Sequence, residues 1–77
     1  MWLALAVLLQ VSPQAAFHRA VDALAKGDLS AAEQGFQQVL KTQPNHLGAL
    51  GNLGVVYSRM DRVPEAVSVY RRALQQA

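Results

Sequence analysis

The sequence of 77 residues contains no cysteine. This absence excludes a disulfide framework, a thiolate zinc site, a thiol nucleophile and the lipidated cysteine of a bacterial lipoprotein. Charged residues are also scarce, at 16% of the chain, and the net charge is only +2. The basic excess lies in Arg59, Arg62, Arg71 and Arg72. Because these arginines are spread over two expected helices, they indicate a solvated surface, and we expect no nucleic-acid partner.

The sequence also lacks the short motifs that are typical of enzymes. It has no G-x-S-x-G, no H-E-x-x-H and no phosphate-binding glycine loop. His18 and Asp22 stand at positions i and i+4, a spacing that on a helix gives only a weak exposed contact. His46 is far from His18 in the chain, with no carboxylate pattern that would complete a metal site. We therefore expect no enzyme activity, no cofactor and no metal.

One apolar run stands at the N-terminus. Residues 1–11 carry no charged side chain, but the run is shorter than the roughly 20 residues that cross a membrane, so no stable membrane span is expected. It matches the apolar core of a secretory signal peptide, followed by small residues at 12–16. Residues 1–15 are therefore a candidate signal peptide. On this interpretation the chain is exported, to a bacterial periplasm or to the outside; otherwise it is cytoplasmic.

Two features of this segment leave an alternative open. No Lys or Arg precedes the apolar core, and no A-x-A cleavage site follows it. In addition, Trp2 precedes Phe36 by the same interval by which Phe36 precedes Tyr70. Residues 2–11 therefore also fit a capping helix, the degenerate end of an upstream repeat. An uncleaved membrane anchor is a third interpretation.

The most informative stretch runs from residue 50 to residue 74. Its first part carries apolar or small residues at the helical spacing i, i+3, i+4, i+7, namely Leu50, Leu53, Gly54 and Tyr57. Its second part carries a matching stripe of Ala66, Tyr70 and Ala73. Residues 61–64 lie between them and include a proline, which suits the first turn of a helix. The stretch predicts an antiparallel helical hairpin in which Gly54 and Ala66 allow a close approach.

The same pattern occurs earlier in the chain at a constant offset. Matching positions are Ala20 with Gly54, Ala32 with Ala66 and Phe36 with Tyr70. The two residues of each pair are separated by the same number of residues, and we call this separation the repeat offset. The chain divides accordingly into a first repeat at 13–46 and a second at 47–77. Helices are expected at 14–26, 31–42, 46–60 and 64–76.

Capping and turn residues support these bounds. Ser12 is expected to cap the first helix, Ser30 with Glu33 to form a capping box on the second, and Asn45 to cap the third. Gly27 and Asp61 occupy equivalent turns, where a positive φ is often needed.

The spacing resembles the tetratricopeptide repeat, whose pattern is W-x2-L-G-x2-Y, then A-x3-F, then P, over a period of about 34 residues. Leu50 stands in place of the Trp and Tyr70 in place of the Phe. The resemblance implies an all-α fold of antiparallel helix-turn-helix repeats, stacked as a short α-solenoid. It also implies a non-catalytic scaffold for protein–protein interaction. The residues expected to pack within and between repeats are Ala20, Ala32, Phe36, Leu50, Leu53, Gly54, Tyr57, Ala66, Tyr70 and Ala73.

The resemblance further implies a concave groove, lined by the first helix of each repeat, that receives a peptide or helix of a protein partner. The expected groove residues are Phe17, His18, Val21, Asn52, Val55 and Arg59. Of the Lys/Asn/Arg clamp with which co-chaperones of the family hold a carboxylate, only Asn52 matches, so we do not expect capture of a chaperone tail. An extended or helical apolar segment fits better, with Arg59 available for an acid.

The last helix ends without a polar cap, and Val67, Val69, Tyr70 and Leu74 are expected to remain exposed on it. The chain therefore fits a part of a longer exported array, with self-association through this uncapped helix as the alternative. A second function class is the N-terminal arm of a larger enzyme, such as a glycosyltransferase of the O-GlcNAc type. A membrane-active amphipathic peptide is disfavoured because charges of both signs are interspersed.

Overall fold

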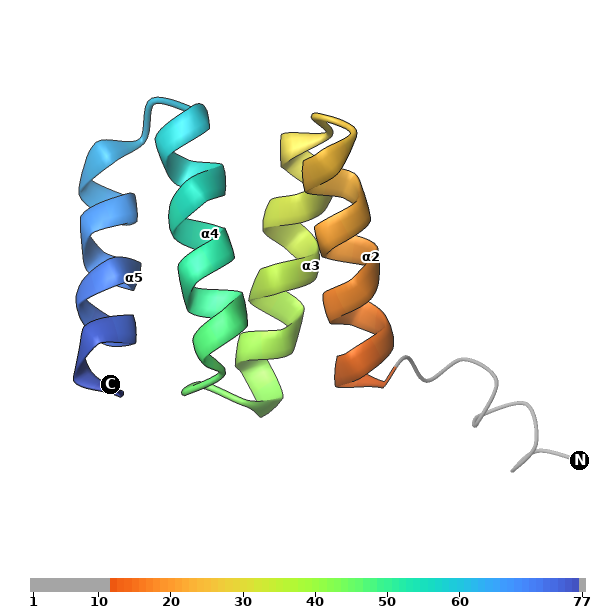
Figure 1. Ribbon diagram of the computed structural model, residues 1–77, viewed down its shortest axis with the longest axis horizontal. Helices are drawn as coiled ribbons and strands as arrows, with labels where there is room; N and C mark the ends of the chain where they lie inside the picture. The colour runs from red at the N-terminus through yellow and green to blue at the C-terminus, as the bar shows by residue number, and fades with distance from the viewer. Residues whose placement is uncertain (1–11, 77) are drawn as a thin grey trace, which may run out of the picture.

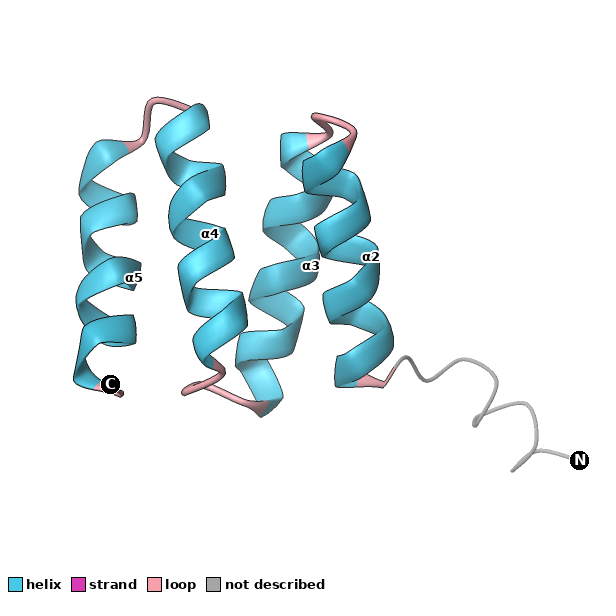
Figure 2. Cartoon of the chain, in the orientation of Figure 1, coloured by secondary structure: helices cyan, strands magenta, loops and turns pink. Residues whose placement is uncertain are grey.

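A computed structural model of the chain describes residues 12–76 (Figure 1). This part forms four helices: α2 (Pro13–Ala25), α3 (Leu29–Thr42), α4 (Leu47–Arg59) and α5 (Val63–Gln75). No strand occurs among the described residues (Figure 2), so the all-α prediction is confirmed. Within the candidate signal peptide, residues 1–11 lie outside the described part, whereas residues 13–15 already form the start of α2.

The helices form two antiparallel hairpins that stand side by side (Figure 1). Helix α2 packs on α3, and α4 packs on α5. The hairpins meet mainly through α3 and α4, with a smaller contact between α2 and α4. This arrangement is the stacked helical repeat that the recurrence in the sequence predicts.

The turn inside each hairpin uses a left-handed residue. Gly27 has φ +81° and Asp61 has φ +61°, and the two positions are separated by the repeat offset. The left-handed region is open to glycine and costs other residues energy, although aspartate tolerates it better than most. The predicted turn geometry is therefore confirmed in both repeats.

The helix caps were only partly predictable. Ser12 caps α2 as expected, because its hydroxyl accepts from the Ala15 N–H at 3.1 Å. The other two predicted caps are wrong. Asp28, rather than Ser30, caps α3 through its bond from the Ala31 N–H at 3.2 Å. His46, rather than Asn45, caps α4.

The displaced capping candidates have other partners. The Glu33 carboxylate turns toward the second repeat, where it accepts from Arg62 at 2.9 Å, so it forms no capping box. Asn45 lies in the loop between the hairpins, and its Oδ1 accepts from the Gln76 amide at 3.3 Å. Arg72 donates to the Pro44 carbonyl oxygen at 3.0 Å. The end of α5 is thus tied to the loop between α3 and α4.

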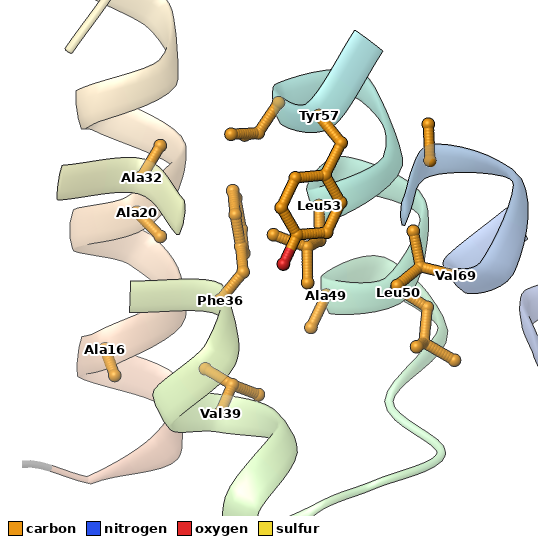
Figure 3. Close-up of a cluster of buried hydrophobic side chains, with 12 residues drawn as sticks. Ala16, Ala20, Ala32, Phe36, Val39, Ala49, Leu50, Leu53, Tyr57 and Val69 are labelled. Carbon is orange, nitrogen blue, oxygen red and sulfur yellow. The ribbon is translucent and has the colours of Figure 1, made fainter. Parts of the chain in front are cut away.

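The core lies between α3 and α4 and extends into each hairpin (Figure 3). Phe36 is completely buried and points into the space between the hairpins, where Leu53 and Tyr57 of α4 meet it. Of the ten expected packing residues, the structure buries eight: Ala20, Ala32, Phe36, Leu50, Leu53, Gly54, Tyr57 and Ala66. Ala73 is half-buried, and Tyr70 keeps 38% of its surface exposed.

The structure also corrects the exposure expected on α5. Val69 is only 6% exposed, because it packs in the core cluster with Ala66. Val67 and Leu74 remain exposed as expected, at 40% and 73%. Val69 therefore belongs to the inner face of α5 and not to its open face.

Small residues shape both hairpins, but in different ways. Gly54 lies under the ring of Tyr70, where an added Cβ would overlap the ring atoms. In the first hairpin, Gly35 lies against Ala20 of the facing helix. There, a Cβ on Gly35 would come 2.7 Å from the Cβ of Ala20 and 3.3 Å from its Cα. Gly35 did not stand out in the sequence, because its equivalent in the second repeat is Val69.

Candidate functional site

The expected groove residues lie on α2 and α4, the two first helices, which are in direct contact. His18 and Asn52 are separated by the repeat offset, as are Val21 and Val55, so each pair occupies equivalent places in the two repeats. His18 and Val21 are exposed on α2, with Val21 at 36%. Asn52 and Val55 are half-buried on α4, and Arg59 is exposed in its last turn.

Phe17 takes a different position from its neighbours in this set. Its ring packs edge-on against Phe36, with the ring centroids 5.7 Å apart, and lies 4.9 Å from the ring of His46. The side chain is half-buried against the core. Phe17 thus joins the two repeats at the start of α4, and only its remaining surface is open to a ligand.

His46 is a residue of this region that the sequence-based predictions missed. Its Nδ1 accepts from the Ala49 N–H at 3.0 Å and so caps α4. The sequence contained a signal for this cap. Ser12 caps α2, and His46 lies one repeat offset after Ser12. The ring therefore has two roles, capping one helix and packing on Phe17 of another.

Asn52 is held by its own helix. Its amide nitrogen donates to the Gly48 carbonyl oxygen at 2.9 Å. This bond fixes the orientation of the amide group, so its oxygen is presented in one direction. The arrangement can accept one hydrogen bond from a ligand on the α4 side of the surface.

A polar network joins the hairpins at the other end of α4. Arg62 donates to Glu33 at 2.9 Å and to Glu65 at 2.8 Å, and its guanidinium lies 4.7 Å from the centre of the Tyr57 ring. Gln37 donates to the Tyr57 hydroxyl at 2.9 Å. From the sequence, Arg62 was assigned only to the solvated surface, because a contact between residues 33 and 62 depends on the stacking of the repeats.

The charges in this network favour the ionised forms of Arg62 and Glu65. The hydrogen bond to Glu65, followed by the contacts with Glu33, raises the pKa of Arg62 above its ordinary value. The hydrogen bond from Arg62 lowers the pKa of Glu65, and a backbone hydrogen bond adds to this effect. Both directions follow from stabilisation of the charged form by an opposite charge.

A sequence model of the tetratricopeptide repeat family matches residues 23–77. The chain belongs to this family. The tetratricopeptide repeat is typically a non-catalytic module for protein interaction, so this tetratricopeptide repeat protein is a protein-interaction scaffold. Comparison with curated proteins and with solved structures gave no significant match.

Two shallow hollows of this tetratricopeptide repeat protein lie beside α3. The larger, of about 430 Å³, is lined by Gln34, Gln37, Gln38, Lys41 and Thr42. The smaller, of about 240 Å³, lies between α2 and α3, with Ala16, Ala20 and Gly35 among its lining residues. Neither hollow includes a residue of the expected groove.

Neither a metal centre nor a membrane span is found among the described residues. They contain no group of three or more His, Cys, Asp or Glu side chains that could hold a metal ion. Within residues 12–76, no helix has the length and apolar character to cross a membrane.

Proposed function

We propose that the surface of α2 and α4 binds an apolar segment of a partner protein, extended or helical, that carries an acidic residue near one end. The observation that carries this proposal is the repeated placement of His18 with Asn52 and of Val21 with Val55 on two helices in contact. A ligand that lies across both helices meets the same type of side chain twice. Each repeat then contributes one apolar contact and one polar contact.

The chemistry of the ligand follows from these side chains. Val21 and Val55 offer partly exposed apolar surface, whose burial against a ligand is worth about 25 cal/mol per Å². The oriented oxygen of Asn52 accepts from a backbone N–H of the ligand, and the exposed Arg59 pairs with a carboxylate. The remaining open surface of Phe17 extends the apolar contact toward the start of α4.

Selection of a ligand from a displayed peptide library, followed by titration of the selected peptides, tests the proposal. We expect the peptides to share apolar residues and one acidic residue. Val55→Asp should weaken binding at least tenfold, and Arg59→Glu should weaken it severalfold. Gln38→Glu, on α3 away from this surface, is the matched control and should bind like the parent chain. If the peptides bind the Val55→Asp and Arg59→Glu chains as tightly as the parent, the surface of α2 and α4 is not the site.

The rest of the proposal concerns the cellular setting. We propose that the chain is exported as part of a longer array and that its leader is removed after Ala15 or Ala16. Cleavage there would remove Ser12, which caps α2, and the first residues of that helix. N-terminal sequencing of the protein from its native host tests this proposal. An intact Met1 on abundant protein would contradict the leader and favour the capping helix at residues 2–11.

Two further expectations stay predictions. The first is that the repeats form the N-terminal arm of a larger enzyme. The gene sequence after the codon for Ala77 tests this, because it either encodes a catalytic domain or does not. The second is self-association through α5, which sedimentation of the chain at several concentrations tests.

A further inference from the structure

The two hairpins are joined by the chain at one end and by side chains at the other. The chain passes from the first hairpin to the second through residues 43–46, which connect the end of α3 to the start of α4 (Figure 1). The turns inside the hairpins, at Gly27 and Asp61, lie at the opposite end of the row (Figure 1). Since the described backbone does not link the hairpins at this second end, their spacing there depends on side-chain contacts.

Side-chain contacts surround the connecting loop. Arg72 of α5 donates to the Pro44 carbonyl oxygen at 3.0 Å. The ring of His46 lies 4.9 Å from the ring of Phe17 on α2. Both hairpins are thus held to the loop, and this end of the molecule can turn as a hinge but cannot spread.

Four side chains form a closed ring of contacts at the other end: Glu33 and Gln37 of α3, Tyr57 of α4, and Arg62, which precedes α5. Arg62 donates to Glu33 at 2.9 Å, and its guanidinium lies 4.7 Å from the centre of the Tyr57 ring. The amide of Gln37 donates to Glu33 at 3.3 Å and to the Tyr57 hydroxyl at 2.9 Å. We call these four residues the latch.

The latch differs from the core in the kind of restraint that it supplies. The apolar contacts between α3 and α4 have no preferred direction, whereas hydrogen bonds require a defined geometry. Although the Arg62 side chain is 41% exposed, that of Glu33 is only 17% exposed, so water competes less for the carboxylate. The core therefore resists separation of the hairpins, and the latch decides the angle between them.

The latch is not a general consequence of the repeat. One repeat offset after Glu33 and Gln37 stand Val67 and Arg71. Valine cannot accept a hydrogen bond, so the same ring of contacts cannot form at the equivalent place on α5. The latch is therefore specific to this pair of hairpins.

We propose that the hairpins turn about a hinge at residues 43–46 and that the bond between Glu33 and Arg62 holds them at one angle. When the charge of Glu33 is removed or screened, the latch ends of the hairpins move apart. Helices α2 and α4 belong to different hairpins and share only a small contact, so the spacing between Ala25 and Arg59 follows the latch. A ligand across α2 and α4 then meets a spacing that Glu33 controls, and this last step alone rests on the proposed function.

Distances between spin labels on the full chain, measured by double electron–electron resonance, test the hinge. The chain contains no cysteine, so a pair of introduced cysteines carries the only labels. The latch-end distance joins Ala25→Cys to Ser68→Cys, in the half of α5 nearer the latch. The hinge-end distance joins Gln14→Cys to Gln75→Cys. All four positions are exposed.

We expect Glu33→Ala to shift the latch-end distance to longer values and to broaden its distribution, while the hinge-end distance stays near that of the parent. Glu65→Ala is the matched control, because Glu65 is the other carboxylate on Arg62 but lies in the same repeat. This variant should change neither distance. High salt, which screens the ion pair, should lengthen the latch-end distance in the parent but not in the Glu33→Ala chain.

Three results would overturn the proposal. The first is a latch-end distance that Glu33→Ala leaves unchanged. The second is the same change in Glu65→Ala, and the third is an equal change at both ends, which would mean that the whole interface loosens. If circular dichroism shows that Glu33→Ala is unfolded, the salt series on the parent decides, and a constant latch-end distance there overturns the proposal. No measurement uses a ligand, so the proposed function is judged separately by its own titrations.

Discussion

Gly35 of α3 lies directly against Ala20 of α2, so that a Cβ on the glycine would stand 2.7 Å from the Cβ of the alanine. The next nearest atoms are the Ala20 Cα at 3.3 Å and the Ala16 carbonyl oxygen at 3.4 Å, and such backbone atoms move only if the helices separate. We therefore expect Gly35→Ala to lower the free energy of unfolding by about 1–3 kcal/mol through overpacking. Denaturant titration followed by circular dichroism measures this change.

The control for this variant is Gly54→Ala. Its added Cβ meets the Tyr70 ring, which is 38% exposed and can turn outward. Gly54→Ala should therefore cost less than Gly35→Ala. Equal costs, or a Gly35→Ala chain as stable as the parent, would contradict the close contact of α2 and α3.

Gly27 offers a separate test of backbone conformation. A Cβ at Gly27 would meet nothing within 4 Å, but the residue has φ +81°. Gly27→Ala should therefore cost about 1–2 kcal/mol for conformational reasons alone. Thermal melts of the variant measure this cost as a lower midpoint.

Gly51→Ala is the matched control for Gly27→Ala, and the opposite effect on stability is expected. Its added Cβ also meets nothing within 4 Å, but Gly51 lies inside helix α4. Because alanine is the better helix former, this variant should be more stable by up to about 1 kcal/mol. Shifts of the same sign in the Gly27→Ala and Gly51→Ala chains would contradict the left-handed turn at Gly27.

His46 should contribute to stability through its cap on α4. His46→Ala removes the acceptor for the Ala49 N–H and the ring that lies on Phe17, so we expect a loss of about 0.5–2 kcal/mol from the cap alone. His46→Asp restores an acceptor at the helix N-terminus but not the ring. Amide hydrogen exchange at Ala49 should speed up in His46→Ala and stay near the parent rate in His46→Asp. Fast exchange in both variants would mean that the ring contact, and not the cap, holds the start of α4.

The pair of Arg62 and Glu65 predicts an acid-sensitive contribution to stability. The pKa of Glu65 is lowered on folding, so the unfolded chain binds the proton more readily. Its contribution is therefore present above the ordinary carboxyl value of 4.5 and is lost as the pH falls through the lower folded value. Because the pKa of Arg62 is raised above its ordinary value, the arginine stays charged throughout this range.

Glu65→Gln tests that contribution. Unfolding titrations of the parent and the variant, taken at intervals from about pH 6 to pH 3, should converge as the pH falls. Curves that remain parallel over the whole range would show that the ion pair does not affect folding.

The fold could be predicted from the sequence because it depends on local and periodic signals. The helical spacing from Leu50 to Tyr57 and its recurrence at the repeat offset were enough to place the hairpins. The left-handed turns at Gly27 and Asp61 followed from residue type, since few residues accept a positive φ. The helical spacing and the turn residues are each decided within a few residues along the chain, and the recurrence repeats the same local pattern.

The contacts that depend on stacking could not be predicted in the same way. Glu33 looked like part of a capping box, but the structure gives its carboxylate to Arg62, which the second repeat brings near. Val69 was expected to be exposed because no cap was identified behind the last helix, whereas it packs in the core cluster with Ala66. The groove residues were named from the family resemblance and not from a local signal in the sequence.

The contacts between helices also bear on how the molecule opens. Helix α3 packs on two neighbours and α4 on three, whereas α5 packs on α4 alone. Opening therefore proceeds from the ends of the row, as in one-dimensional cooperative systems, and amides of α3 and α4 exchange with solvent last. The bonds of Arg72 and Gln76 to the loop at residues 44–45 act against this order, since they hold the far end of α5 to the middle of the row. The contacts of Arg62 with Glu33 and Glu65 hold the other end of α5, so this helix is expected to separate as a unit rather than to fray from one end.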